Sequence, residues 1–354
     1  MGLKTWLGLL SGKAKEISAN RVGLVIVTSM ISLIIAFMNS VARAWERCRG
    51  LPSLDISENE SPIFIIGHWR SGTTLLHELL CCIYELRAPT TYQCFCPGHF
   101  LLTEGVATRL LRWVLPENRG IDKIRISWNS PQEDEFALLM MGAQSPYRRI
   151  AFPSLGNQLN GLDITELPLE NRRYWRQSLL MFVKRLMLRD KRRVVLKSPS
   201  HTARLSNLLS LFPGAKFIFI SRNPMDMIPS AIKLWKHLDF VHGLNSKGLT
   251  DYSRYALTLF LDVETAYLRD KELLSEKELV ELRYEDLISG PAETLEKIML
   301  QLDLGGLHID FAAFDSVLAS ISENIPEKYE LDTDERRYIA EATSNYCRRY
   351  GYAH

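Results

Sequence analysis

Hydrophobic residues gather in short runs along most of the chain, and segments with helical spacing separate these runs. Four runs are short and apolar enough to form buried strands. They cover residues 63–66, 194–196, 216–221 and 279–283. Helices are expected to follow them within 75–83, 205–211, 222–235 and 291–302. Because crossover helices pack back onto the strands that they connect, this alternation predicts an α/β fold of three layers, with a central parallel sheet flanked by helices.

The first fifty residues follow a different pattern. Val22–Met38 contains seventeen residues without a charge, which would span about 25 Å as a helix and fall short of the roughly 30 Å hydrocarbon core of a bilayer. Before it, the apolar residues between Leu3 and Ile17 recur on one helical face, as in a basic amphipathic helix that lies in a membrane interface. Three arrangements remain open: a helix in the membrane plane, one short span, and a hydrophobic helix or hairpin packed on the catalytic domain.

A polar linker follows this segment. Residues 50–62 are rich in Pro, Asp and Glu, which are typical of a domain boundary. We therefore divide the chain into a basic and hydrophobic helical segment, residues 1–50, and one catalytic domain, residues 51–354. A chain of 354 residues is long enough for such a domain to bury a full core.

Charge is distributed unevenly along the chain. The formal net charge is only +2, which gives no reason to expect nucleic acid as a partner. Residues 1–50 nevertheless contain seven Lys or Arg and two Glu, so this segment carries a charge of +5. A basic N-terminus favours contact with an anionic membrane surface.

The cysteine content indicates a reducing compartment. The six cysteines form no Cys-x-x-Cys pair, so their spacing favours neither a disulfide framework nor a zinc site. The single glycosylation sequon, Asn59-Glu60-Ser61, is weakened by Pro62. We therefore expect a cytoplasmic protein, free or attached to the inner face of a membrane, and disfavour a membrane of the secretory pathway.

One stretch combines a strand, a turn and a helix in the manner of a phosphate-binding loop. In IIGHWRSGTTLL, residues 65–76, two glycines separated by four residues end a strand and open a helix. Such a loop binds anions because its N–H groups converge and the helix N-terminus adds partial positive charge. The residues expected to bind the anion are Gly67, Arg70, Ser71, Gly72, Thr73 and Thr74.

The loop lacks the lysine of nucleoside triphosphatases. Thr73 stands at that position, and the nearest cation is Arg70 inside the turn. The lysine normally reaches the terminal phosphates beside a magnesium ion, whereas an arginine presents a flat, permanently charged fork. The sequence therefore predicts a site for a phosphate-like group that needs no metal.

The loop resembles the 5′-phosphosulfate loop of sulfotransferases that use 3′-phosphoadenosine 5′-phosphosulfate (PAPS). In that family an arginine that begins Arg-[Asn/Asp]-Pro-x-Asp, and a serine eight residues later, hold the 3′-phosphate of the donor. Arg222 begins such a segment here, and Ser230 stands eight residues on. Tyr284 lies in a third segment, LRYEDL, that is similar to the family segment whose tyrosine lies by the adenine.

A further resemblance points to the bacterial-type branch of this family. Lys197 and His201 stand in VLKSPSH, which is similar to the branch's Lys-x-x-x-His segment, and the resemblance as a whole runs from about residue 62 to about residue 300. Two positions depart from the cytosolic small-molecule enzymes. Leu75 replaces a tryptophan of the phosphosulfate loop, and Pro199 stands where their catalytic histidine would fall. The resemblance therefore leaves the catalytic base undecided.

The resemblance implies a P-loop-like fold and an in-line transfer of a sulfuryl group, which is analogous to phosphoryl transfer. Arg70 and Lys197 are expected to stabilise the leaving phosphate. Glu133 and His201 are the two candidate bases. Each also has a structural interpretation, because Glu133 opens a predicted helix, where acidic residues are common, and His201 fits a hydrogen bond near its loop.

The sequence thus predicts transfer from PAPS, as co-substrate, to a hydroxyl or amine of a small-molecule, lipid or glycan acceptor. Residues 85–190 are expected to supply the acceptor pocket. Two alternatives remain open: a P-loop kinase or nucleotide hydrolase, and a catalytically inactive, membrane-associated nucleotide-binding protein. The missing lysine and the pairing of Arg222 with Ser230 disfavour the first.

Overall fold

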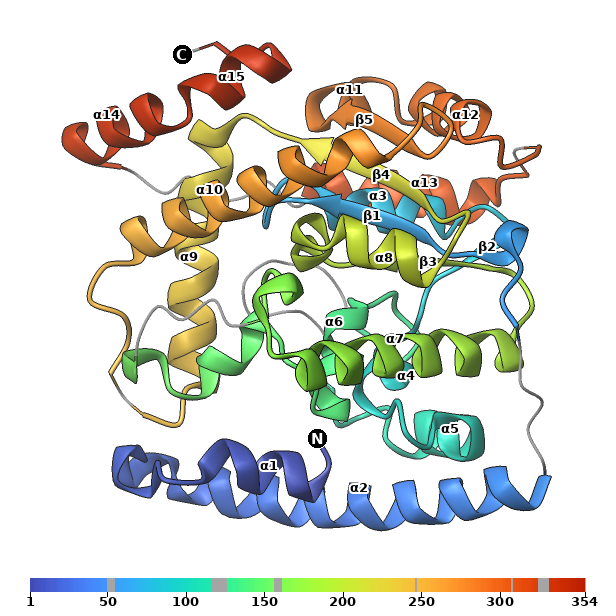
Figure 1. Ribbon diagram of the computed structural model, residues 1–354, viewed down its shortest axis with the longest axis vertical. Helices are drawn as coiled ribbons and strands as arrows, with labels where there is room; N and C mark the ends of the chain where they lie inside the picture. Colours follow the sequence, from blue (N-terminus) through green and yellow to red (C-terminus); the bar gives the residue numbers. More distant parts are fainter. Residues whose placement is uncertain are drawn as a thin grey trace.

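A sheet of five parallel strands in the order β2-β3-β1-β4-β5 forms the centre of the molecule (Figure 1). The computed structural model describes residues 1–49, 55–115, 126–155, 161–245, 247–306, 308–323 and 331–353. The strands are β1 Ile63–Gly67, β2 Leu86–Arg87, β3 Arg193–Lys197, β4 Lys216–Ser221 and β5 Leu279–Arg283. Helices cover both faces of the sheet, so the predicted three-layer α/β fold is confirmed.

All four strands expected from the sequence are present, and two of them have the predicted bounds. The fifth strand, β2, was missed because it contains only two residues, fewer than the roughly four that a strand pattern needs. It extends the sheet by pairing with Arg193 and Val194 at the edge of β3. Residues 50–54 of the expected linker lie outside the described residues.

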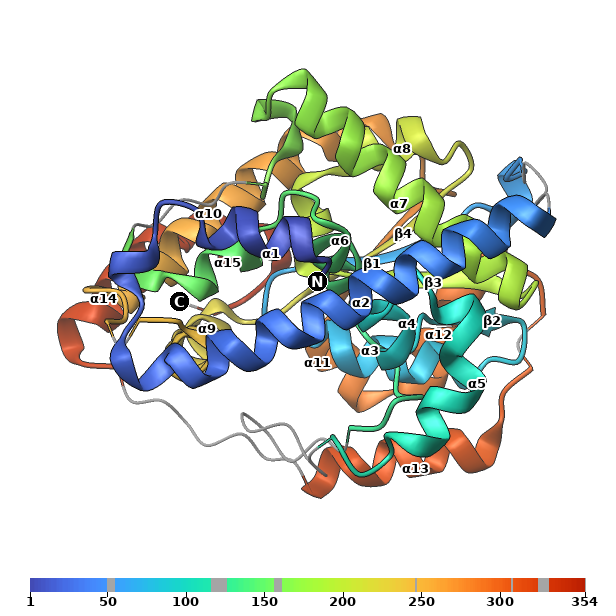
Figure 2. The same cartoon turned by 90° about the horizontal axis from the view of Figure 1, so that it is seen from below.

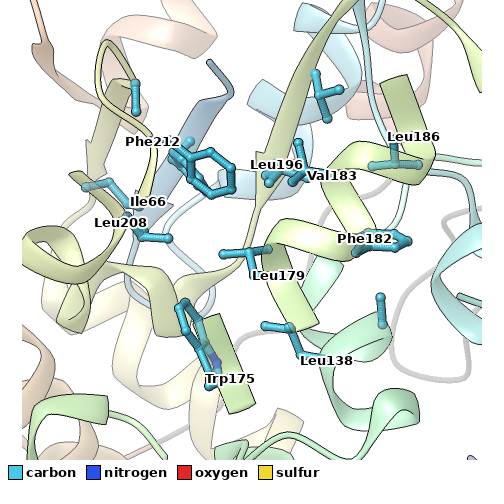
Figure 3. Packing of buried hydrophobic residues seen from close by; sticks show 14 of the residues in the cluster. Ile66, Leu138, Trp175, Leu179, Phe182, Val183, Leu186, Leu196, Leu208 and Phe212 are labelled. Carbon is cyan, nitrogen blue, oxygen red and sulfur yellow. The ribbon is translucent and has the colours of Figure 1, made fainter. Parts of the chain in front are cut away.

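The central strands β1, β3 and β4 are buried on both faces. Phe64 and Ile66 of β1 point to one face, where they pack with apolar residues of α6 Asp134–Met141, α7 Leu169–Arg189 and α8 Leu205–Leu211. Figure 3 shows Trp175, Leu179 and Phe182 in this layer, together with Leu196 of β3. Ile63 and Ile65 point to the other face, where they meet α3 Thr73–Leu80, α12 Pro291–Gln301 and α13 Phe311–Glu323. The alternation of side chains along a strand builds both cores at once.

A further helical layer extends beyond the sheet. Apolar residues of α9 Pro224–His242 and α10 Tyr252–Asp270 pack together and with α14 Thr333–Ala342 and α15 Ser344–Tyr350. Outside the N-terminal segment, the other α-helices that the structure describes are α4 Thr91–Phe95, α5 Phe100–Leu110 and α11 Tyr284–Ser289.

Two helices form the N-terminal segment, α1 Leu3–Leu10 and α2 Val22–Arg49. The helix expected from Leu3 to Ile17 ends early, because Gly12 adopts a φ of 73° and turns the chain. The apolar segment continues as a helix to Arg49, which makes α2 long and apolar enough to cross a membrane. Instead, α2 runs along one side of the α/β body, next to α1 and α5 (Figures 1 and 2).

The N-terminus also contacts α6. The backbone N–H of Gly2 donates to the Met140 carbonyl at 3.4 Å, and the terminal amine lies 2.8 Å from the Met140 sulfur. Gly142 ends α6 with a φ of 95°, and the Thr5 side chain packs where a Cβ would stand. The C-terminal end of α6 therefore rests on α1.

His77 on α3 is buried against the sheet and carries a pH dependence. Its Nε2 lies 3.4 Å from the Val195 carbonyl oxygen, and its side chain is almost fully buried. Burial, and then the nearby Lys197 ammonium, lower the pKa of His77 to about 3. An unfolded histidine has a pKa of about 6.5. The unfolded chain therefore binds a proton at this position over a pH range in which the folded chain does not.

We expect this difference to lower the free energy of unfolding as the pH falls from about 6.5 towards 3, by at most about 1.4 kcal/mol per pH unit. The His77→Gln variant should lose this contribution. Its urea unfolding free energy, measured between pH 7 and pH 5, should therefore fall less steeply than that of the wild type. Parallel pH profiles for the two proteins would contradict the assignment.

Candidate active site

The loop between β1 and α3 is shaped by two glycines. Gly67 has a φ of 148°, and a Cβ at this position would lie 2.6 Å from the Ile220 carbonyl oxygen. Gly72 has a φ of 103°, and a Cβ there would overlap the ring of Tyr284. Both positions therefore require glycine, because any side chain would be strained and would clash. The chain turns tightly at the carboxyl end of the sheet, and α3 begins at Thr73.

Arg70 adopts an unusual conformation within this loop. Its φ of 70° lies in the left-handed region, which residues other than glycine rarely occupy. Its Nε donates to Ser230 Oγ at 2.9 Å, and its carbonyl accepts a hydrogen bond from Arg222 at 3.1 Å. The Arg222 guanidinium in turn lies 4.4 Å from the centre of the Tyr284 ring. Three segments that are distant in the sequence thus place these four residues at one end of the sheet.

Glu133 lies beside the loop and is held from two sides. Lys197, at the end of β3, donates from Nζ to Glu133 Oε1 at 2.8 Å and lies 3.4 Å from Thr74 Oγ1. Tyr147 donates to the other carboxylate oxygen at 2.7 Å and accepts from Trp69 Nε1 at 2.9 Å. The carboxylate is therefore tied to the loop on both of its oxygens.

The surroundings of Tyr147 favour its protonated phenol, which is the form that donates to Glu133. Burial, and then the negative charge of Glu133, raise the pKa of Tyr147 well above its usual value. No pattern in the sequence pairs Tyr147 with Glu133, because Tyr147 stands in a turn that follows the helix opened by Glu133. Only the folding of residues 143–147 back against the start of α6 brings them together.

The two residues that follow Glu133 have buried partners of their own. His201 Nε2 lies 2.6 Å from Asp134 Oδ2, and both side chains are fully buried. The Arg204 guanidinium contacts Glu135 at 2.6 Å, and both of these side chains are fully buried as well. Three consecutive acidic residues thus bind three basic residues, Lys197, His201 and Arg204, in one continuous acid–base ladder.

The buried end of this ladder is charged. Burial acts to raise the pKa of Glu135, but the charge and hydrogen bonds of Arg204 outweigh it and hold the pKa below its usual value. Ser200 Oγ also donates to this carboxylate at 2.7 Å. Buried charges of this kind persist only when they are paired and hydrogen-bonded. The ladder therefore joins the segment after β3 firmly to the start of α6.

The structure brings together most of the candidate residues from the sequence. The loop is formed by Gly67, Arg70, Ser71, Gly72, Thr73 and Thr74. Next to it lie Arg222, Ser230 and Tyr284. Lys197 and Glu133 meet beside Thr74. His201 does not join them, because its ring is enclosed by Asp134, Phe64 and Trp175.

Sequence reasoning missed the contribution of the C-terminal helix. The Tyr346 hydroxyl accepts from the backbone N–H of Arg222 at 3.3 Å. The Tyr352 hydroxyl lies 3.1 Å from Ser221 Oγ and 3.0 Å from Glu285 Oε2. These tyrosines support the turn that carries Arg222, and no motif in the sequence marks them.

In this site, three cationic side chains and one carboxylate surround the backbone of the loop between β1 and α3. Arg70, Arg222 and Lys197 suit an anion with more than one charged group, and Glu133 is placed to accept a proton nearby. Among the residues that the structure describes, no group of three or more His, Cys, Asp or Glu side chains is arranged to hold a metal ion.

Comparison with known proteins identifies sulfotransferases as relatives of this chain. The model of the sulfotransferase family matches residues 62–306. Two relatives are 33% identical to the chain over 349 residues, which cover 98% of this chain and 89% of each relative. They are the omega-hydroxy-beta-dihydromenaquinone-9 sulfotransferase Stf3 of Mycobacterium bovis and that of Mycobacterium tuberculosis.

Two solved structures share the fold. Sulfotransferase STF9 from Mycobacterium avium has a TM-score of 0.66 at 17% identity, over 99% of this chain and 96% of its own. Sulfotransferase STF1 from Mycobacterium tuberculosis has a TM-score of 0.60 at 16% identity, over 97% of this chain and 91% of its own. The likeness extends over the N-terminal helices as well as the sheet.

The acid–base ladder makes a prediction for stability. Replacing Arg204 with Met should leave Glu135 buried and unpaired, and should cost about 3–5 kcal/mol in the free energy of unfolding. The matched control is Arg337→Met, which breaks an exposed ion pair with Asp334 and should cost no more than about 1 kcal/mol. Urea unfolding of both variants checks this. A loss at Arg204 no larger than that of the control would contradict a structural role for the ladder.

Proposed function

The chain belongs to the sulfotransferase family, and on that premise we propose that it transfers a sulfuryl group from PAPS to the hydroxyl of a lipid-soluble acceptor. The observation that carries the proposal is the convergence of two anion sites at one end of the sheet. One is the loop from Gly67 to Thr74, and the other is the pair Arg222 and Ser230. A donor with phosphate groups at its 5′ and 3′ positions needs two such sites.

Each site supplies a different part of donor binding. The loop presents backbone N–H groups and the Arg70 fork to the 5′-phosphosulfate. Arg222 and Ser230 are assigned to the 3′-phosphate, and the Tyr284 ring, already beside Arg222, is assigned to the adenine. No metal is required in this scheme, because the cations that neutralise the donor are side chains of the protein.

The transfer step uses the groups around Glu133. The acceptor oxygen forms a bond to sulfur while the bond from sulfur to the bridging phosphate oxygen breaks, which releases adenosine 3′,5′-bisphosphate. Glu133 takes the proton of the acceptor hydroxyl. Arg70 and Lys197 stabilise the negative charge that develops on the bridging oxygen. Lys197 is well placed for this because it contacts both Thr74 of the loop and Glu133.

His201 receives a positioning role in this scheme. Its ring is fully buried and bonded to Asp134, the residue after Glu133. It therefore fixes the start of α6, and with it the direction of the Glu133 carboxylate, rather than touching the acceptor.

The acceptor class rests on the relatives. The two Stf3 proteins are named for an omega-hydroxylated dihydromenaquinone, a lipid that carries a hydroxyl group. We propose an acceptor of the same kind, an alcohol on a lipid-soluble molecule. Such an acceptor resides in a membrane, which agrees with a catalytic domain, residues 51–354, on the cytoplasmic face and an N-terminal segment, residues 1–50, in contact with the bilayer.

The central experiment is incubation of the full chain with sulfur-35-labelled PAPS and separate panels of hydroxylated quinones, glycans and phenols. Label should move to the hydroxylated quinones without added magnesium. Magnesium-dependent turnover of ATP would instead favour the kinase or hydrolase. Absence of transfer to every panel, together with no binding of adenosine 3′,5′-bisphosphate, would refute the proposal.

The assignment of Arg222 predicts a loss of discrimination. Arg222→Met should weaken binding of adenosine 3′,5′-bisphosphate by about 10- to 100-fold, because a charge-assisted hydrogen bond contributes about 1.5–3 kcal/mol. Binding of adenosine 5′-monophosphate, which has no 3′-phosphate, should change little. Isothermal titration calorimetry measures both, with the exposed Arg254→Met as the matched control. Equal weakening for both nucleotides would place the 3′-phosphate elsewhere.

The assignment of Glu133 predicts a loss of rate without a loss of donor binding. Glu133→Gln keeps the shape and a hydrogen-bond acceptor but removes the base, so kcat should fall by about 10²- to 10⁴-fold. Affinity for adenosine 3′,5′-bisphosphate should stay within about 3-fold of the wild type, a change below the roughly 1.4 kcal/mol that corresponds to tenfold. The exposed Glu341→Gln serves as control. Wild-type kcat in Glu133→Gln would assign the base to another residue.

A further inference from the structure

Helix α2 is amphipathic, but its apolar face points away from the protein. A surface helix of a water-soluble protein has its apolar face turned inward. Apart from Val25, which packs in an apolar cluster at its first turn, the side of α2 that contacts the protein carries mostly small and polar residues: Ser29, Ser32, Asn39, Ala42 and Glu46. Its outer face carries large apolar side chains, each 50–63% exposed: Ile26, Val27, Met30, Ile31, Leu33, Ile34 and Phe37. The outer face of α2 is therefore built for an apolar environment.

A second helix extends this apolar surface. Leu102, Val106 and Leu110 repeat every four residues on α5 and are 39%, 65% and 66% exposed, and Trp113 just beyond the helix is 78% exposed. The two helices lie side by side in both views (Figures 1 and 2). Their junction is close, because Asn39 of α2 packs against the backbone at Gly98, just before α5. We call the outer faces of α2 and α5 together the apolar platform.

Contacts along its whole length hold α2 against the domain. Near its start, Arg21 donates to the carbonyls of Phe240 and Val241 at 2.5 and 3.4 Å. Within its first two turns, Ser29 accepts from Trp6 Nε1 at 2.8 Å. Near its end, Glu46 accepts two hydrogen bonds from Arg185, at 2.9 and 3.0 Å. A helix crossing a bilayer would break these contacts and would expose its serines and Asn39 to lipid, at a cost that unpaired polar groups make high.

Basic residues stand at both ends of the platform. Lys13, Lys15 and Arg21 precede the apolar stripe, and Arg43, Arg47 and Arg49 follow it. All but Lys13 and Arg21 are exposed, and those two are half-buried. Lys and Arg that flank an apolar face complement anionic lipid headgroups. A second protein surface would not require positive charge at both ends, so the charge pattern favours a bilayer.

We infer that the apolar platform docks the protein on an anionic lipid bilayer, with α2 lying parallel to the membrane plane and α5 inserted beside it. This deepens, and rests on, the membrane contact proposed above, but it does not depend on the sulfuryl-transfer chemistry. It assigns the interfacial arrangement to α2 and excludes the span. It also adds α5, which no pattern in the N-terminal segment indicated.

The test is flotation of the full chain with vesicles of phosphatidylcholine and phosphatidylglycerol in equal parts, and with vesicles of phosphatidylcholine alone. Wild type should float with the anionic vesicles, less with the neutral ones, and less at high salt. Met30→Glu with Ile34→Glu should reduce binding at least tenfold, and Val106→Glu with Leu110→Glu should reduce it severalfold. The matched control, Leu300→Glu with Phe311→Glu, places charges at residues that are 82% and 71% exposed on α12 and α13 and should leave binding unchanged.

Affinity for adenosine 3′,5′-bisphosphate, measured on the same variants, reports folding independently of docking and should be unchanged in all of them. A failure of sulfuryl transfer would leave the flotation result unaffected, so the two proposals can fail separately. Wild-type flotation of the α2 variant would overturn the inference. So would a dimer in sedimentation that the α2 variant dissociates, without vesicle binding, because the platform would then be covered by a second copy.

Hydrogen exchange distinguishes the docked helix from a span. In-plane docking keeps the contacts of α2 with Arg185 and Gly98, so amides around both positions should stay as protected on vesicles as in solution. Faster exchange at these positions on vesicle binding would show that α2 leaves the domain to cross the bilayer, and would overturn the parallel orientation.

Discussion

The acid–base ladder between residues 133–135 and residues 197–204 is the constraint on which the site depends. Glu135 and Arg204 are fully buried, so each requires the other as a partner, and Asp134 and His201 are paired in the same way. These two pairs fix the distance between β3 and the start of α6. Glu133 and Lys197, at the open end of the ladder, then meet beside the loop without being able to separate. Acidic residues also suit a helix N-terminus, so the local and the long-range preferences agree.

The fold was predicted well because strands, turns and helices leave patterns within a few neighbouring residues of the sequence. The strands β4 and β5 were found with their bounds, since β4 is a β-branched and aromatic run and β5 is a short run in which apolar residues dominate. The anion-binding loop was predicted for the same reason, because its glycines, its helix start and Arg70 lie within a few residues. Strand β2 was not predicted because a strand of two residues is too short to form a recognisable pattern.

Contacts between residues that are far apart in the sequence could not be predicted from the sequence alone. Glu133, Lys197 and His201 were each identified as candidates, but nothing in their spacing shows that Glu133 meets Lys197 while His201 meets Asp134. The roles of Tyr147, Trp69 and Tyr346 depend on contacts of the same long-range kind. The N-terminal segment was ambiguous for a related reason. Its apolar content is visible in the sequence, but the side that faces the protein is decided by partners such as Arg185, which stands far along the chain.

Helix α6 connects the candidate active site to the N-terminal segment. Its first residue follows Glu133, and its last turn rests on Gly2 and Thr5 of the N-terminal segment. Eight helical residues form a rod about 12 Å long. The ladder holds the first end of this rod, and α1 supports the other. The Glu133 carboxylate is thereby braced through both ends of one short helix, which makes the N-terminal segment part of the framework behind the candidate base.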